Sequence, residues 1–249
     1  MLERFILIIL KGGDKVQQNT LKWLGHACFS ITTSKGKVIL IDPWITGNPV
    51  CPVTLAEIEN VDMILVTHDH FDHSANVAEI SQKTGATVVG FPETVGKLKT
   101  GHALPEGNVI FGGIGMNIGG TATIDDISIT MTQAFHSSET GAPCGYLIRL
   151  ENGPIVYHAG DTGIFASMQT LGDLYPIDVA LLPVGSCFTM DPVQAAAALK
   201  LLRPKKAIPM HYKTFPILEQ DAAGFVRLAK ARAPDVEVVV LEPGEAYRF

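Results

Sequence analysis

The stretch "ILVTHDHFDHSAN", residues 64–76, places three histidines and two aspartates within six consecutive positions. The whole chain of 249 residues contains only eight histidines, so composition alone does not account for this cluster. Four apolar or β-branched residues precede it and indicate a buried strand that ends near Thr67. We interpret the cluster as a set of polar side chains at a strand end, where local chemistry requires them.

The spacing within the cluster suits metal binding. Alternate side chains of a strand point to the same face, so His68 and His70 can bind one ion together. Asp72 and His73 follow where the chain turns, aimed differently but close by, which suits a second ion. Zinc accepts imidazole nitrogen and carboxylate oxygen as ligands. The alternative interpretation is a solvated polar turn or a group of helix-capping residues.

A catalytic zinc site needs more ligands than this cluster supplies, and three later segments offer them. His136 in "TQAFHSSETG", Asp161 in "YHAGDTG" and His211 in "AIPMHYKTF" each follow an apolar, strand-like run. Gly160 would allow the backbone beside Asp161 to approach closely. Taken singly, each of these residues could also be an ordinary strand-end or capping residue.

Strand-like runs mixed with helix-like segments predict an α/β or α+β fold, with sheets packed on each other and helices outside. Strands are expected in "TLKWL", "CFSITT", "KVILID", "DMILVT", "ATVVGF", "ISITMTQA", "PCGYLIRL", "PIVYHAG", "DVALLPV", "KKAIPM" and "VEVVVLE". Helices are expected over residues 74–83, 93–99, 163–171, 192–202 and 217–233. In "DPVQAAAALKLL", Asp191 is expected to cap a helix that has Pro192 in its first position.

No linker or repeat divides the chain, so we predict one domain over residues 19–249, preceded by an N-terminal extension at 1–18. The apolar run from Phe5 to Leu10 is shorter than a secretory signal core or a membrane span. The net charge is −6 with a pI near 5.7, and no run of Lys or Arg exceeds two, which disfavours nucleic acid and anionic membranes. The four cysteines lack CxxC spacing and are interpreted as reduced thiols of a cytoplasmic protein.

The motif HxHxDH, then a lone His, an Asp after Gly and a final His, resembles the metallo-β-lactamase superfamily from about Leu21 to the C-terminus. The segments "WLGHACFSI", "IDPWITGNP", "AFHSSETGAPCGYLI", "YHAGDTGIF" and "PMHYKTFP" resemble its uncharacterised metal-dependent hydrolases related to L-ascorbate-6-phosphate lactonases. The resemblance implies a four-layer αββα sandwich. The implied ligands are His68, His70 and His136 for a first ion, Asp72, His73 and His211 for a second, and Asp161 for both.

This resemblance also implies a function. A hydroxide bound to two metal ions would attack a small ester, lactone or phosphoester, because zinc can bring the pKa of bound water to roughly 7 from 15.7. Zinc is the expected metal, with manganese, iron or nickel as alternatives. Asp72 is predicted to orient or transfer a proton as a catalytic residue. His26 in "LGHAC" is predicted to approach the pocket as a second catalytic residue, and a core histidine bonded to backbone is the equal alternative.

Two other functions are weighed. A binding or scaffold protein of the same fold would be expected to have lost ligands, and this chain has the full set of seven. A phosphodiesterase acting on lipids would need an apolar, membrane-facing surface, which the sequence does not indicate. We therefore expect a small-molecule substrate, leave open a homo-oligomer, and regard Lys213 and Thr214 as candidates to contact a substrate phosphate or carboxylate.

Overall fold

The computed structural model describes residues 18–249, and its strands form two sheets. The first sheet has the strand order β13 (Ala246–Arg248), β1 (Thr20–Trp23), β2 (Phe29–Thr32), β3 (Val38–Ile41), β4 (Met63–Leu65) and β5 (Thr87–Val89). The second has the order β12 (Glu237–Val238), β11 (Lys206–Met210), β10 (Val179–Pro183), β9 (Ile155–His158), β8 (Cys144–Arg149), β7 (Ile127–Gln133) and β6 (Thr121–Ile124). The predicted extension over residues 1–18 lies outside the described residues, apart from Gln18.

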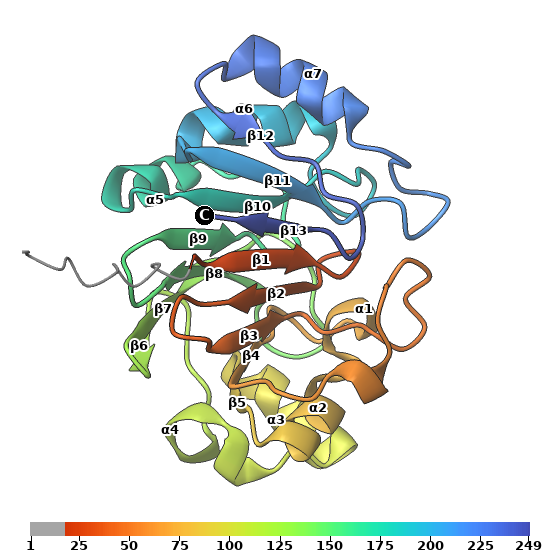
Figure 1. The fold of residues 1–249 in the computed structure, drawn as a ribbon, viewed down its shortest axis with the longest axis vertical. Coiled ribbons are helices and arrows are strands. Elements are labelled where there is room, and N and C mark those ends of the chain that lie inside the picture. The colour runs from red at the N-terminus through yellow and green to blue at the C-terminus, as the bar shows by residue number, and fades with distance from the viewer. Residues whose placement is uncertain (1–17) are drawn as a thin grey trace, which may run out of the picture.

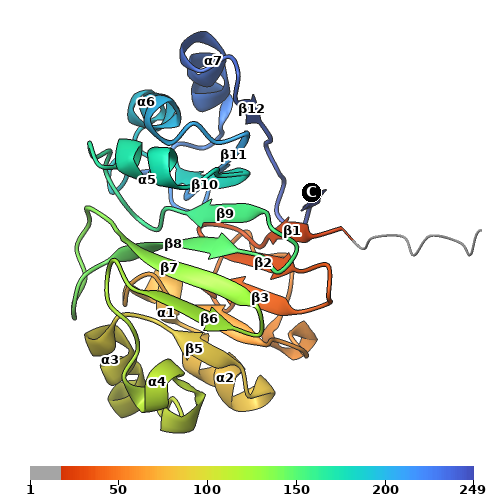
Figure 2. The same cartoon turned by 90° about the vertical axis from the view of Figure 1, so that its left-hand side faces the viewer.

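Helices cover the outer faces of both sheets (Figure 1). On the side of the first sheet lie α1 (Phe71–Ser74), α2 (Val77–Thr84), α3 (Pro92–His102) and α4 (Ile110–Gly113). On the side of the second lie α5 (Met168–Leu174), α6 (Pro192–Leu202) and α7 (Ala223–Arg232). Short 3-10 turns occur at Leu55–Glu57 and Glu106–Asn108. The predicted αββα arrangement of layers is confirmed, as the second view also shows (Figure 2).

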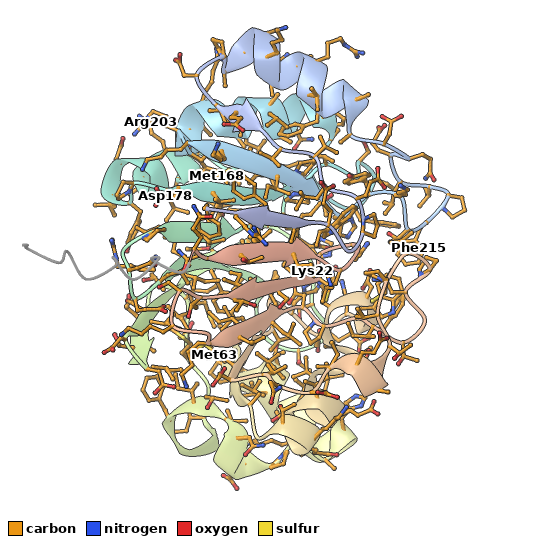
Figure 3. The ribbon with its side chains drawn as sticks, viewed as in Figure 1. Lys22, Met63, Met168, Asp178, Arg203 and Phe215 are labelled. Atoms are coloured by element: carbon orange, nitrogen blue, oxygen red, sulfur yellow. The ribbon has the colours of Figure 1, made fainter. Side chains whose placement is uncertain are left out.

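Period-two alternation in the strands explains this layering. In β3, Ile39 and Ile41 point into the core between the two sheets, whereas Leu40 packs with residues of α2 and α3. The same division occurs in β4, where Ile64 belongs to the helix-covered side. Met63, labelled in Figure 3, belongs to the core between the sheets. Strands with both faces buried read as continuous apolar runs, which is the pattern of "VILI" and "MIL".

The sequence predicted most of these elements. Helix α6 has the predicted bounds, and the Asp191 carboxylate accepts a hydrogen bond from the Gln194 backbone N–H at 2.7 Å. The helices expected from residues 163 and 217 begin only at Met168 and Ala223. In the segments expected to form their first turns, the Gly163 N–H bonds to the Phe135 carbonyl and the Glu219 N–H bonds to the Gly185 carbonyl. Strands β6 and β13 were not predicted.

Candidate metal centre

Loops that follow four strands bring the predicted ligands together. Strands β7, β9 and β11 run in the same direction within the second sheet, so their carboxyl ends lie at one edge. His136, Asp161 and His211 follow these three strands within one to three residues, as the sequence predicted. His68 and its neighbours come from the other sheet, after β4.

His68 and His70 lie close together, but not through the strand alternation that the sequence predicted. Strand β4 ends at Leu65 rather than near Thr67, so strand alternation does not align His68 with His70. His68 instead lies in a loop, and His70 is the residue that precedes α1. Their nitrogens His68 Nε2 and His70 Nδ1 nevertheless lie 2.9 Å apart. The following helix then places Asp72 and His73 in its single turn.

The side chains gather into overlapping groups whose potential ligand atoms all lie within 4.8 Å of one another. The groups are His68, His70 and His136; His26, Asp72, His73 and His211; and His68, His73 and Asp161. All seven predicted ligands therefore lie in one centre. The second group contains one further residue, His26, for which the sequence predicted no ligand role.

Asp161 lies between the groups. Its Oδ2 atom is 2.9 Å from Nε2 of His211, 3.3 Å from Nε2 of His73 and 3.5 Å from Nε2 of His136. The carboxylate thus contacts members of both predicted ligand sets. Gly160 before it has a φ of +62°, and a Cβ atom there would lie 2.3 Å from the Cys144 carbonyl oxygen, so glycine is required at this close approach.

The donor set fits divalent cations. Among the described residues, His73 Nε2, Asp161 Oδ1 and His211 Nδ1 are buried side-chain atoms without a hydrogen-bond partner. Buried polar atoms are normally paired, because leaving them unpaired costs free energy. Imidazole nitrogens and carboxylate oxygens are ligands of zinc and related metals, so cations bound beside Asp161 would satisfy His73 Nε2 and Asp161 Oδ1.

Asp42 is a member of the centre that the sequence analysis missed. It is fully buried and has a φ of +48°. Its carboxylate accepts hydrogen bonds from the Thr67 backbone N–H at 2.8 Å, the Thr67 hydroxyl at 2.7 Å and His73 Nδ1 at 2.7 Å. Since a carboxylate only accepts, it holds a proton on Nδ1 of His73 and directs Nε2 towards Asp161. A carboxylate directly after the buried run "VILI" was the signal that could have found it.

Asp69 was also missed, although it lies inside the motif. Its carboxylate accepts hydrogen bonds from the backbone N–H groups of Glu139 and Thr140, each at 2.8 Å, and from Lys97 Nζ at 3.2 Å. These donors belong to the loop that carries His136 and to α3. Asp69 therefore fixes the His136 loop against the segment that carries the other ligands.

His26 is fully buried and contacts Asp72 rather than the solvent. Its Nε2 lies 3.1 Å from Asp72 Oδ2, and its Nδ1 lies 2.7 Å from the Thr214 hydroxyl. Thr214 is thus engaged, and Lys213 pairs with Glu242 at 2.9 Å. The expectation that Lys213 and Thr214 contact a substrate finds no support, because neither lines the cavity described next.

A cavity of about 990 Å³ opens onto the centre. His70, Asp72, His136, Asp161 and His211 line it, so members of both predicted ligand sets face the same space. Phe215 lies on the loop after β11, at the edge of the molecule where α1 also lies (Figure 3). His102, the last residue of α3, also lines this cavity.

Comparison with known proteins decides the family. The family model for the beta-lactamase superfamily domain matches residues 37–212. A UPF0173 metal-dependent hydrolase of Caldivirga maquilingensis is 49% identical over 226 residues, covering 90% of this chain and 96% of the relative. One from Pyrobaculum islandicum is 47% identical over 232 residues, covering 92% and 99%. The chain belongs to the UPF0173 metal-dependent hydrolases.

A solved structure supports the same assignment. Igni18, described as a novel metallo hydrolase of Ignicoccus hospitalis, superposes on this UPF0173 hydrolase with a TM-score of 0.83 at 40% identity. The match covers 93% of this chain and 98% of Igni18. The predicted superfamily and hydrolase class are thereby confirmed. These relatives' descriptions do not mention L-ascorbate-6-phosphate, so that narrower part of the resemblance stays a prediction.

Several histidines in the centre of this UPF0173 hydrolase have lowered pKa values, which keep them in the neutral form. Burial, reinforced by nearby His211, lowers the pKa of His26 to about 4. Burial likewise holds the pKa of His68 well below its ordinary value and lowers the pKa of His136. These imidazoles are neutral at pH 7, and a neutral imidazole nitrogen is the form that binds a metal.

For His73 and Asp72, in contrast, neighbouring charged groups and hydrogen bonds outweigh the effect of burial on the pKa. Burial alone would lower the pKa of His73, but the neighbouring carboxylates of Asp161 and Asp42 outweigh it and hold that pKa well above its ordinary value. Burial alone would raise the pKa of Asp72, yet the hydrogen bond with His26 and the charges of His73 and His26 together outweigh it, and the pKa is lowered. The pKa of Asp161 is also held well below its ordinary value, so the Asp72 and Asp161 carboxylates are ionised at neutral pH, and their negative charge favours a cation in the centre.

Proposed function

We propose that this hydrolase holds two divalent metal ions and hydrolyses a small ester, lactone or phosphoester. The observation that carries the proposal is the position of Asp161, whose Oδ2 atom contacts His136 of the first predicted ligand set and His73 and His211 of the second. A single carboxylate between two ligand sets is the arrangement expected of a bridging ligand in a two-metal site.

The proposed ligands are His68, His70 and His136 for one ion, Asp72, His73 and His211 for the other, and Asp161 for both. When bound, the ions would activate a water molecule near neutral pH and stabilise the negative charge that develops on the substrate. Zinc suits these nitrogen and oxygen ligands, and manganese, iron and nickel are alternatives. The expected substrate is a small molecule that enters the cavity.

Residues of the chain would orient these ligands. Asp42 fixes the tautomer of His73, as carboxylate partners of ligating histidines do. Asp72 is partly exposed in the cavity, with 15% of its side chain accessible, so it can both bind a metal and accept or return a proton. His26 contacts Asp72 from the buried side, and we assign it a positioning role through that carboxylate.

Metal reconstitution tests the proposal. Protein stripped with a chelator would be titrated with zinc and assayed on 4-nitrophenyl acetate, a γ-lactone and bis(4-nitrophenyl) phosphate. We expect hydrolysis of at least one substrate to saturate near two equivalents of zinc. Asp161→Asn should fail to reach this stoichiometry. Asp178→Asn is the control and should reach it, because this substitution removes only an ion pair with Lys205 that lies away from the centre. Full activity without metal, or saturation at one equivalent, would contradict the two-metal site.

The proposal includes a cytoplasmic location. Its support is chemical: Cys28, Cys51, Cys144 and Cys187 are all free thiols in the structure, which suits a reducing compartment. Within residues 18–249, moreover, each helix is too short or too polar to cross a bilayer.

A further inference from the structure

The cavity has an apolar entrance beside the polar centre. Phe71, Phe188 and Ile217 line it and are 62%, 54% and 60% exposed, although large apolar side chains are usually covered. Leu98, Phe215 and Pro216 extend the same lining. These residues come from α1, α3, the loop after β10 and the loop after β11, so the fold gathers apolar groups from four separate segments at one opening. A contiguous exposed apolar surface of this kind marks a binding site.

Part of this lining is held open by aromatic packing. Phe215 stacks on Trp44 with ring centroids 5.6 Å apart, and Phe71 meets the same indole edge-on at 5.6 Å. Trp44 is only 3% exposed, so it forms a fixed support behind the two phenylalanines. The rings therefore present a wall prepared before a ligand arrives, and preformed apolar walls with few polar groups are typical of small-molecule sites.

The charged residues of the cavity argue against a phosphorylated substrate. Within residues 18–249, Lys97 is the one lysine or arginine in the lining, and it is already paired with Asp69 at 3.2 Å and Glu139 at 2.6 Å. Phosphate recognition generally uses unpaired Arg or Lys side chains or backbone N–H groups at a helix start. Lys213, the nearest basic residue to His211 in sequence, is paired with Glu242 outside the lining. As far as the described part of the chain lines it, the cavity thus offers a substrate apolar contacts but no free lysine or arginine.

We propose that the cavity takes an uncharged carboxylic ester or lactone with an apolar chain, the carbonyl lying at the centre and the chain lying along Phe71, Phe188, Phe215 and Ile217. This rests on the proposed hydrolytic function and narrows its substrate class. In the reaction, a water oxygen bonds to the carbonyl carbon and the ester C–O bond breaks. The bonding electrons leave with the alkoxide oxygen, which takes up a proton derived from the water, giving a carboxylic acid and an alcohol.

Chain length provides the first test. Metal-loaded protein would be assayed with 4-nitrophenyl acetate, butyrate and hexanoate below their aggregation limits. Complete burial of one methylene changes affinity about fourfold, so we expect kcat/KM to rise about two- to fourfold per added methylene. Ile217→Ala and Phe188→Ala should flatten this rise. Ile114→Ala is the matched control, because Ile114 is 65% exposed but lies outside the cavity, and it should leave the rise unchanged.

A binding measurement separates this inference from the hydrolytic function. Metal-free protein would be titrated with 2-butanone, 2-hexanone and 2-octanone, which carry a carbonyl but cannot be hydrolysed. The change in tryptophan fluorescence would be followed, to which Trp44, stacked on Phe215, contributes together with Trp23. Affinity should increase with chain length, and Ile217→Ala should remove the increase. If the ketones behave so but no ester is cleaved, the proposed function fails and the apolar site stands. Ester cleavage without any chain-length dependence would overturn the apolar site alone.

Two further outcomes would also overturn the inference. One is tighter binding of octyl phosphate than of 2-octanone to the metal-free protein, since without the ions that preference requires a cationic subsite on the chain. The other is activity on long-chain esters only when they are presented in phosphatidylcholine vesicles, with none on dissolved esters. That result would mean that the exposed Phe71, Phe188 and Ile217 contact a lipid surface rather than the substrate chain.

Discussion

Replacing Asp42 with asparagine tests how the fold prepares the metal ligands. The substitution keeps the size of the side chain but exchanges one acceptor oxygen for an NH₂ donor. The Thr67 backbone N–H can keep its oxygen partner, and the Thr67 hydroxyl can rotate to accept. Nδ1–H of His73 would then face a donor across a contact that is 2.7 Å in the native protein. The imidazole must either leave Nδ1–H unpaired or move its proton to Nε2, the nitrogen that faces Asp161.

Both the unpaired Nδ1–H and the displaced proton would have effects that can be measured, on the free energy of unfolding and on zinc affinity. One buried unpaired donor costs about 1–3 kcal/mol of the free energy of unfolding. Loss of the partner of a ligating histidine typically weakens metal binding about 10- to 100-fold. We therefore expect Asp42→Asn to unfold at lower urea concentration in the metal-free state and to lose one of two zinc-binding events at a chelator concentration that the native protein withstands.

Urea unfolding with and without zinc, together with chelator competition, would measure both effects. Asp62→Asn is a suitable control, because Asp62 also accepts a strand N–H, from Val38 at 2.8 Å, but lies away from the centre. It should lower stability without changing zinc affinity. Native zinc affinity in Asp42→Asn would refute the claim that Asp42 positions His73.

Three more predictions follow from particular contacts. Asp69→Asn should weaken zinc binding and broaden the NMR signals of the His136 loop, because the Asp69 carboxylate holds that loop through two backbone N–H groups; unchanged affinity would count against this role. Gly185→Ala should lower zinc stoichiometry measured by elemental analysis, since the new Cβ would lie 1.9 Å from the His211 carbonyl oxygen, and normal stoichiometry would show that the loop adapts. Burial lowers the pKa of His158, whose Nε2 lies 2.9 Å from the Ala27 carbonyl oxygen, so the unfolded chain binds more protons below pH 6.5 and stability falls as pH drops. The slope of unfolding free energy against pH between 6.5 and 5 should be shallower in His158→Gln by up to about 1.4 kcal/mol per pH unit, and equal slopes would contradict this.

The sequence indicated candidate ligands because each follows a recognisable apolar run, and the resemblance to the metallo-β-lactamase superfamily implied their roles. Strand ends can be located from local patterns, and loops after neighbouring strands converge at one edge, so His136, Asp161 and His211 could be assigned before their contacts were known. The supporting residues could not be assigned in this way. Asp42 meets Thr67 across 25 positions and Asp69 meets Thr140 across 71, and no local pattern encodes such pairings.

The missed and shifted elements have similar explanations. Strand β13 has three residues and is largely exposed, so it carries almost no alternation, and its position is fixed by pairing with β1 at the opposite end of the chain. In the segments before α5 and α7, the Gly163 and Glu219 N–H groups bond to the carbonyls of Phe135 and Gly185, which lie far away in sequence, so no local pattern indicates these contacts. The apolar entrance of the cavity was also invisible, since its residues come from separate segments.

The central claim is that seven side chains enclose a pair of cations, and anomalous diffraction from crystals of the zinc-loaded protein tests it most directly. The account predicts two anomalous peaks. One should lie about 2.0–2.2 Å from nitrogens of His68, His70 and His136, the other at similar distances from Asp72, His73 and His211, with Asp161 binding both. A single peak, or a pair of peaks that Asp161 does not join, would contradict it.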